Sequence, residues 1–141
     1  MAAFVIDAAA TLPWCFADEA TAATNAVLIG LRTGDEAIVP AHWPLEVGHA
    51  LMIAVRRQRI SLDDANQFLL DLEFLPIRVE AGTKSRVRSG VLPLALQYGL
   101  TVYDAAYLEL ALREGLSLIT LDRDLRKAAA AAGVPLVGPQ S

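Results

Sequence analysis

Short apolar runs of strand length alternate with longer segments of helical periodicity along most of the chain. The apolar runs predict strands at 2–6, 37–39, 76–79, 117–121 and 134–137. Apolar positions that recur every three to four residues predict helices at 20–31, 44–57, 61–72, 84–98, 101–114 and 123–132. Residues 9–17 are expected to form a short helix or turn that Pro13 interrupts.

Capping and turn residues support these boundaries. Ser61 with Asp64 resembles a capping arrangement at a helix start, and Pro44 suits a first helical turn. In the helix at 101–114, which reads as amphipathic, Glu109 and Arg113 are four positions apart and are expected to pair on the solvent side. Glycines predict the ends of several helices: Gly34, Gly99, Gly115 and Gly133.

The alternation of strands and helices predicts an α/β fold. We expect one domain over residues 1–141 with three layers, α/β/α, around a central, mainly parallel sheet of four to five short strands. In such sheets, ligands bind beyond the carboxyl ends of the strands.

Composition narrows the class of protein. With 141 residues, 55% hydrophobic and 20% charged, the chain is typical of an ordered globular protein. Its apolar runs are too short for a membrane span, and no secretory signal is visible at the start. The single cysteine, Cys15, excludes an internal disulfide and fits a reducing, cytoplasmic compartment. A net charge of −4 gives no general case for nucleic-acid binding, although acids in a site and bases on its rim remain compatible with it.

Four acidic residues are expected at the carboxyl edge of the sheet. Asp7 ends the first strand, and Glu46 lies in the helix after the second. Asp104 starts the helix before the fourth strand, and Asp122 ends that strand. Acids that converge on one rim repel one another unless protons or a cation compensate, and oxygen ligands suit Mg²⁺ or Mn²⁺.

Each acid also has a structural interpretation. Asp7, Asp104 and Asp122 could each cap a helix; for Asp104 alone capping is favoured, and for Asp7 capping and function are equally good interpretations. Glu46 is harder to explain, because its neighbours, Leu45 among them, are apolar and an apolar helix does not favour an unpaired acid.

Four blocks of sequence carry a family resemblance: Phe-Val-Ile-Asp-Ala-Ala-Ala-Thr-Leu-Pro-Trp, Pro-Leu-Glu-Val-Gly-His-Ala-Leu, Tyr-Asp-Ala-Ala-Tyr-Leu-Glu-Leu-Ala and Leu-Ile-Thr-Leu-Asp-Arg-Asp-Leu. In order and spacing they resemble PIN-domain ribonucleases, and in particular the VapC-type toxins of bacterial toxin–antitoxin pairs. The resemblance spans essentially the whole chain. Each block alone is weakly specific, but four in this order are strongly so.

The resemblance implies a PIN-like fold and a metal-dependent endoribonuclease that hydrolyses RNA phosphodiester bonds, with Mg²⁺ or Mn²⁺ as cofactor. It carries catalytic and metal-binding roles to the four acids: Asp7, Glu46, Asp104 and Asp122. Thr120 matches a supporting hydroxyl residue, and Asp124 is a further candidate ligand. Ala9 departs from the Ser or Asn that is common at its position, so a hydrogen bond that tunes the metal site in relatives is missing.

The resemblance also implies partners, namely a small antitoxin whose arginine reaches the acids and a second copy of the chain in a homodimer. The helices at 20–31 and 44–57 carry more apolar residues than one buried face needs, which is compatible with an interface.

Two basic clusters are candidate RNA contacts. The first ends a helix, where the dipole alone would favour it: Arg56, Arg57 and Arg59. The second opens a helix, where the dipole disfavours it, and is therefore more suggestive: Lys84, Arg86 and Arg88. An ordinary solvated face explains both clusters about equally well.

Other residues and functions fit less well. His42 and His49 flank Glu46, but hard metals prefer oxygen, so a structural or rim role is favoured for both. An aspartate-based phosphatase usually needs a second Asp where Ala9 stands, and a non-catalytic α/β binding module gives no reason for Glu46. A dinucleotide-binding enzyme is disfavoured, because no Gly-x-Gly-x-x-Gly follows the first strand.

Overall fold

The computed structural model describes residues 2–137. Its four strands form one sheet in the order β3-β2-β1-β4, with β1 at Ala3–Ile6, β2 at Glu36–Val39, β3 at Ile77–Val79 and β4 at Ser117–Ile119. All three strand pairs are parallel, and the central Val5 aligns with Ile38 on one side and Leu118 on the other. The carboxyl ends of the strands therefore meet at one edge, as predicted.

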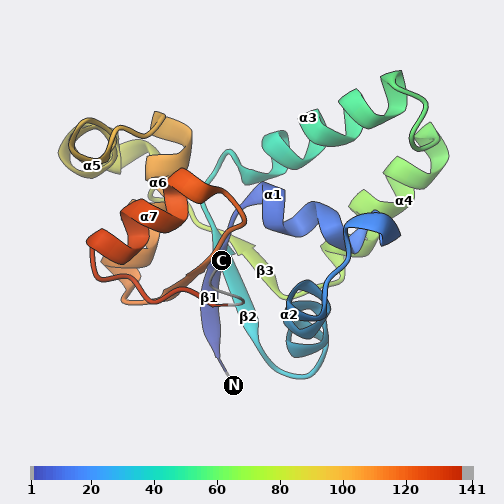
Figure 1. Ribbon diagram of the computed structural model, residues 1–141, viewed down its shortest axis with the longest axis horizontal. Coiled ribbons are helices and arrows are strands. Elements are labelled where there is room, and N and C mark those ends of the chain that lie inside the picture. Colours follow the sequence, from blue (N-terminus) through green and yellow to red (C-terminus); the bar gives the residue numbers. More distant parts are fainter. Residues whose placement is uncertain (1, 138–141) are drawn as a thin grey trace.

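Helices cover both faces of this sheet, which confirms the three-layer α/β/α prediction (Figure 1). On one side lie α1 (Ala8–Thr11), α2 (Ala22–Arg32), α3 (Trp43–Arg56) and α4 (Leu62–Glu73); on the other lie α5 (Leu92–Tyr98), α6 (Val102–Glu114) and α7 (Arg123–Ala131). Short 3₁₀ turns follow α1 on either side of Cys15, η1 at Leu12–Trp14 and η2 at Ala17–Glu19. Among the described residues, none of the helices is long and apolar enough to span a membrane.

Two predicted elements differ from the sequence expectation. Segment 84–98 is not one α-helix but a 3₁₀ turn (η3, Lys84–Arg86), a π-helix (η4, Val87–Val91) and then α5. Pro93, which has no N–H to donate, lies in the first turn of α5 and so places the α-helix start late. The predicted strand at 134–137 is reduced to one bridge between Leu136 and Leu118, because Pro135 cannot donate to a strand ladder.

Apolar side chains are exposed on α2 and α3, as expected, but they are few. Their large exposed apolar side chains are Ile29 and Leu45. More such side chains lie on the segment from η4 to the start of α6: Val87, Leu92, Leu96, Val102 and Tyr103.

Helix α6 is buried along most of its length, so the amphipathic expectation fails for it. Every residue from Ala105 to Ala111 is buried, including Glu109, which is only 7% exposed. The predicted pair of Glu109 and Arg113 forms, but inside the protein instead of on the solvent side. Arg113 Nε lies 2.9 Å from Glu109 Oε2.

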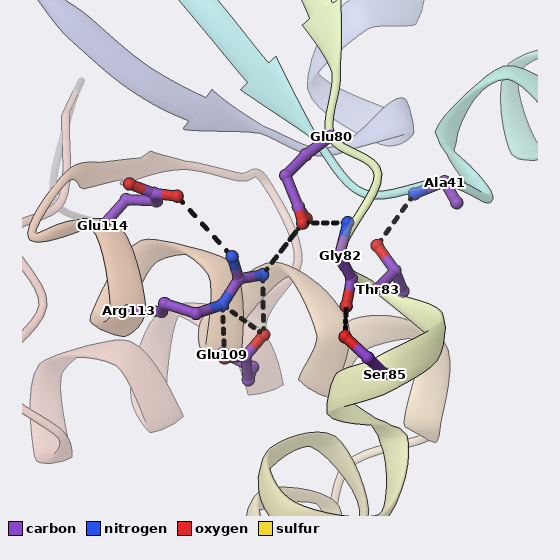
Figure 2. Close-up of polar contacts among 8 residues, drawn as sticks. All are labelled: Ala41, Glu80, Gly82, Thr83, Ser85, Glu109, Arg113 and Glu114. Carbon is purple, nitrogen blue, oxygen red and sulfur yellow. Dashed lines mark hydrogen bonds and ion pairs between the residues drawn. The ribbon is translucent and has the colours of Figure 1, made fainter.

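Arg113 joins α6 to the loop after β3 (Figure 2). Its Nη2 lies 3.1 Å from Oε2 of Glu80, a buried residue directly after β3, and its Nη1 lies 3.5 Å from Glu114 Oε1. The Glu80 carboxylate also accepts the Gly82 N–H. Next to this turn, the Thr83 hydroxyl oxygen accepts the Ala41 N–H at 3.1 Å, which ties the loop to the start of α3. We call Glu80, Glu109 and Arg113 the arginine brace.

Replacing Arg113 by Met should lower the free energy of unfolding by roughly 3 kcal/mol, because it leaves two buried carboxylates without their cation. Urea denaturation at neutral pH measures this. The control Arg32→Met removes an exposed guanidinium and should cost less than about 0.5 kcal/mol. Equal small losses in both variants would mean that the brace contributes nothing specific to stability.

Candidate functional site

The four predicted acids lie at the carboxyl edge of the sheet, each on the element from which it was expected. Asp7 and Asp122 are the N-caps of α1 and α7, directly after β1 and just beyond β4, while Glu46 and Asp104 lie in the first turns of α3 and α6. Burial is the first cause of the raised pKa values of Asp7 and Asp104, and the charges of other acids add to it: those of Asp104 and Asp122 for Asp7, and those of Asp122 and Glu46 for Asp104. We call these four residues the acid cluster.

Asp7 is the most buried member, at 4% exposed. Its Oδ1 accepts the Ala10 N–H at 2.8 Å, and its Oδ2 accepts the hydroxyl of the fully buried Thr120. Burial raises the pKa of Asp7 to about 6, although these two hydrogen bonds lower it. Asp7 therefore caps a helix and also belongs to the acid cluster, so the two interpretations of this residue are compatible.

Asp122 is held in a similar way. Its Oδ1 accepts the Leu125 N–H at 2.8 Å, which makes it a helix cap, and its own N–H donates to Thr120 Oγ1 at 3.0 Å. Thr120 thus connects Asp7 with Asp122, in keeping with the supporting role predicted for its hydroxyl.

Asp104 is not a helix cap, so the structural interpretation favoured for it alone is wrong. Thr101 caps α6, and its Oγ1 accepts the Asp104 N–H at 3.1 Å. The half-buried Asp104 carboxylate has a raised pKa, first because of burial and then because of Asp122 and Glu46. Asp124, in the first turn of α7, adds a smaller contribution of the same sign.

Glu46 has partners that the sequence analysis did not identify. The Tyr107 hydroxyl donates to Glu46 Oε1 at 2.5 Å, and His42 Nε2 lies 3.4 Å from the same oxygen. The expected apolar enclosure is wrong in one respect, because Leu45 is 78% exposed. The signal that could have identified Tyr107 is its position three residues after Asp104, on the same face of α6.

The histidines occupy different positions. His42 lies at the rim of the acid cluster, where its positive form would lower the pKa of Asp104. His49 is exposed on α3.

The donor set of the acid cluster fits a hard divalent cation, because all four residues offer carboxylate oxygens. The negative charges of neighbouring acids contribute, after burial, to the raised pKa values of Asp7 and Asp104. Within residues 2–137, however, no group of three or more His, Cys, Asp and Glu is placed closely enough to hold a metal ion as it stands.

The side chains of the first basic cluster differ in the partners that they already have within the protein. Arg59 already has partners: it forms ion pairs with Asp18 at 2.8 Å and Glu19 at 2.6 Å, and it lies 3.9 Å over the Phe16 ring. Arg56 and Arg57 are exposed at the far end of α3 from Glu46.

The second basic cluster lies on different secondary structure from that predicted. Lys84, Arg86 and Arg88 are exposed on η3 and η4. Because this segment does not open an α-helix, the argument from an unfavourable helix dipole does not apply to it.

A broad groove of about 1110 Å³ lies apart from the acid cluster, between residues 14–18 and the α3–α4 hairpin. None of the four acids lines it. Cys15 does, and burial raises the pKa of its thiol, which agrees with a packed apolar role.

Asp7→Asn should stabilise the metal-free protein at high pH. A raised pKa means that the folded state holds its proton longer than the unfolded state, so the penalty grows as pH rises from 3.8 to about 6 and then stays constant. This difference corresponds to about 3 kcal/mol. Denaturation in EDTA should therefore show the variant more stable than wild type at pH 8, with the gap closing near pH 4. A gap independent of pH, or one equal to that of the exposed Asp63→Asn, would contradict the burial of a charge at Asp7.

Comparison with known proteins identifies the family to which the chain belongs. The PIN domain family model matches residues 4–131. Ribonuclease VapC3 of Pyrobaculum aerophilum is 38% identical over 80 residues, which make up 57% of this chain and 61% of VapC3. The aligned region thus spans less than two thirds of that relative.

Solved structures with low sequence identity share the fold. PAE2754 from Pyrobaculum aerophilum has a TM-score of 0.71 at 23% identity, over 96% of this chain and 84% of that one. VapBC2 from Rickettsia felis, bound to a DNA fragment from its promoter, has a TM-score of 0.62 at 12% identity, over 95% and 96% of the two chains. A toxin–antitoxin complex from Klebsiella pneumoniae has a TM-score of 0.63 at 16% identity, over 98% of each chain.

The family match covers the sheet, the helices on both its faces and all four members of the acid cluster. The chain belongs to the PIN domain family.

Proposed function

We propose that this protein is a VapC-type endoribonuclease that hydrolyses RNA phosphodiester bonds with Mg²⁺ or Mn²⁺. The observation that carries the proposal is the convergence of Asp7, Glu46, Asp104 and Asp122 at the carboxyl edge of a PIN-domain sheet. The 38% identity to Ribonuclease VapC3 over 80 residues supports the same activity.

The acid cluster would hold the metal, which when bound would lower the pKa of water and offset charge on phosphoryl oxygens. Because these carboxylates repel one another, a divalent cation that offsets their charge would be favoured at this edge of the sheet. Asp104 suits the role of proton acceptor for the attacking water, because it is half-buried and has a raised pKa. Asp7 is less suited, since both of its oxygens already accept hydrogen bonds.

RNA phosphates would contact the exposed basic residues of η3 and η4: Lys84, Arg86 and Arg88. The loop before them is anchored to α6 through Glu80 and Arg113, so the arginine brace gives these cations a defined position. We place this activity in the cytoplasm, where a protein with the single free Cys15 meets RNA.

Asp104→Asn should reduce metal-dependent RNA cleavage by at least about 100-fold while leaving the fold intact, since it removes a metal ligand and a candidate base. Cleavage of a structured RNA is measured with Mn²⁺, with Mg²⁺ and with EDTA. The exposed Asp63→Asn should retain full activity. A wild-type protein that never cleaves RNA with either metal would favour a non-catalytic binding module, and a fully active Asp104→Asn would remove Asp104 from the mechanism.

Two protein partners complete the proposal. A small antitoxin would inhibit by placing an arginine among the acids, because the planar guanidinium pairs bidentately with carboxylates at any relevant pH. The net charge of −4 would help to attract a basic antitoxin segment. A second copy of the chain would pack on the exposed apolar side chains of η4 and α5, where Val87, Leu92 and Leu96 are 46%, 44% and 78% exposed.

Sedimentation velocity at micromolar concentration tests both partners. The protein alone should sediment as a dimer, and the antitoxin encoded nearby should bind more weakly as Mn²⁺ is raised, because metal and arginine compete for the same carboxylates. A monomer alone would contradict the dimer. Antitoxin affinity that responds neither to Mn²⁺ nor to Asp104→Ala would mean that inhibition acts from a remote surface.

A further inference from the structure

The Glu46 carboxylate is held by groups that the proposed chemistry does not use. Its side chain is 35% exposed, yet its Oε1 accepts a hydrogen bond of 2.5 Å from the Tyr107 hydroxyl. Tyr107 comes from α6 and is 1% exposed, so the two residues join helices on opposite sides of the sheet. Because Tyr107 is buried, the side chains around it limit the movement of its ring.

The His42 ring packs against the Tyr107 ring. The two rings meet edge to face, with centroids 5.1 Å apart and planes at 65°. His42 Nε2 lies 3.0 Å from the Tyr103 carbonyl oxygen, in the first turn of α6, and 3.4 Å from Glu46 Oε1. The imidazole therefore links the start of α3 to the start of α6 and leaves the Tyr107 hydroxyl directed at Glu46.

Between these two groups the Tyr107 hydroxyl is the donor, because an ionised carboxylate has no hydrogen to donate. Among the described residues, the contacts to Glu46 described above all go to Oε1. A donor that occupies one carboxylate oxygen restricts the rotation of the group and leaves the other oxygen, Oε2, for a cation.

Asp7, also in the acid cluster, likewise accepts a hydrogen bond from a buried hydroxyl, that of Thr120, at its Oδ2, but its Oδ1 is engaged as well, by the Ala10 N–H. Two acids from different elements are thus each held by a fully buried hydroxyl donor. Capping alone explains neither hydroxyl, because the helix N–H that Asp7 caps is bonded to its Oδ1 and Glu46 caps no helix.

We propose that Tyr107, supported by His42, is a positioning residue that orients Glu46 so that it binds the divalent cation through Oε2. The inference rests on the proposed function only in taking the cation to be the Mg²⁺ or Mn²⁺ of the acid cluster. Residues that orient a metal ligand in this way typically change metal affinity by about 10- to 100-fold when they are replaced.

The experiment is a Mn²⁺ titration of the full chain without RNA, in which electron paramagnetic resonance counts the free ion. Tyr107→Phe removes only the hydroxyl and should weaken Mn²⁺ binding by about 10-fold or more. Tyr98→Phe, on α5 outside the acid cluster, is the matched control and should bind as wild type does. In a Glu46→Gln background, Tyr107→Phe should have no further effect, because the tyrosine acts through Glu46.

A second variant, His42→Ala, guards against a folding defect in Tyr107→Phe. It leaves the tyrosine in place without its support and should weaken Mn²⁺ binding by a smaller factor. Circular dichroism and thermal unfolding confirm that each variant is folded.

Unchanged Mn²⁺ affinity in Tyr107→Phe, or an equal loss in the Glu46→Gln background, would overturn the proposal, as would a wild-type chain that binds no Mn²⁺. A chain that binds Mn²⁺ and shows the predicted losses but leaves RNA intact would uphold the role of Tyr107 and contradict the ribonuclease activity.

Discussion

Repulsion among carboxylates brought to one edge of a parallel sheet is the constraint around which this structure is organised. The sheet topology brings the ends of β1 and β4 together, and the helices that follow β2 and precede β4 add two more acids. The fold lowers the energetic cost of this repulsion locally, because helix N–H groups, Thr120 and Tyr107 each donate a hydrogen bond to a carboxylate oxygen. The pKa values of Asp7 and Asp104 nevertheless stay raised, first because these carboxylates are buried and then because neighbouring acids repel them. A divalent cation would offset this negative charge most directly.

In the arginine brace, by contrast, the carboxylates are paired with an arginine of the chain itself. At the end of α6 remote from Asp104, Arg113 lies between the buried Glu80 and Glu109, and its pKa is raised, first through the hydrogen bond with Glu109. Here the chain supplies its own cation, so this end of α6 is fixed whether or not a metal is present. Because α6 also carries Asp104 and Tyr107, a firmly anchored helix is a precondition for a precise acid cluster.

The sequence predicted the features that depend on local pattern. Asp7 follows a continuous apolar run, and Glu46 stands out in an apolar helix, so both acids could be placed before the fold was known. Ser61 does cap α4, as its spacing to Asp64 indicated.

Tertiary packing decided the features that the sequence analysis did not predict. Burial of Glu109 and the bond from Tyr107 to Glu46 depend on which face of α6 meets the sheet and the loop after β3, and a period alone cannot supply this. The π-helix at Val87–Val91 and the single bridge at Leu136 depend on proline positions that override a helical or strand pattern.

The central claim is that the four acids form one divalent-metal site, and crystals grown with Mn²⁺ test it most directly. Anomalous scattering at the manganese edge should give a peak bounded by oxygens of Asp7, Glu46, Asp104 and Asp122. A peak only at the carboxylates around Arg113, or none at millimolar Mn²⁺, would contradict the account.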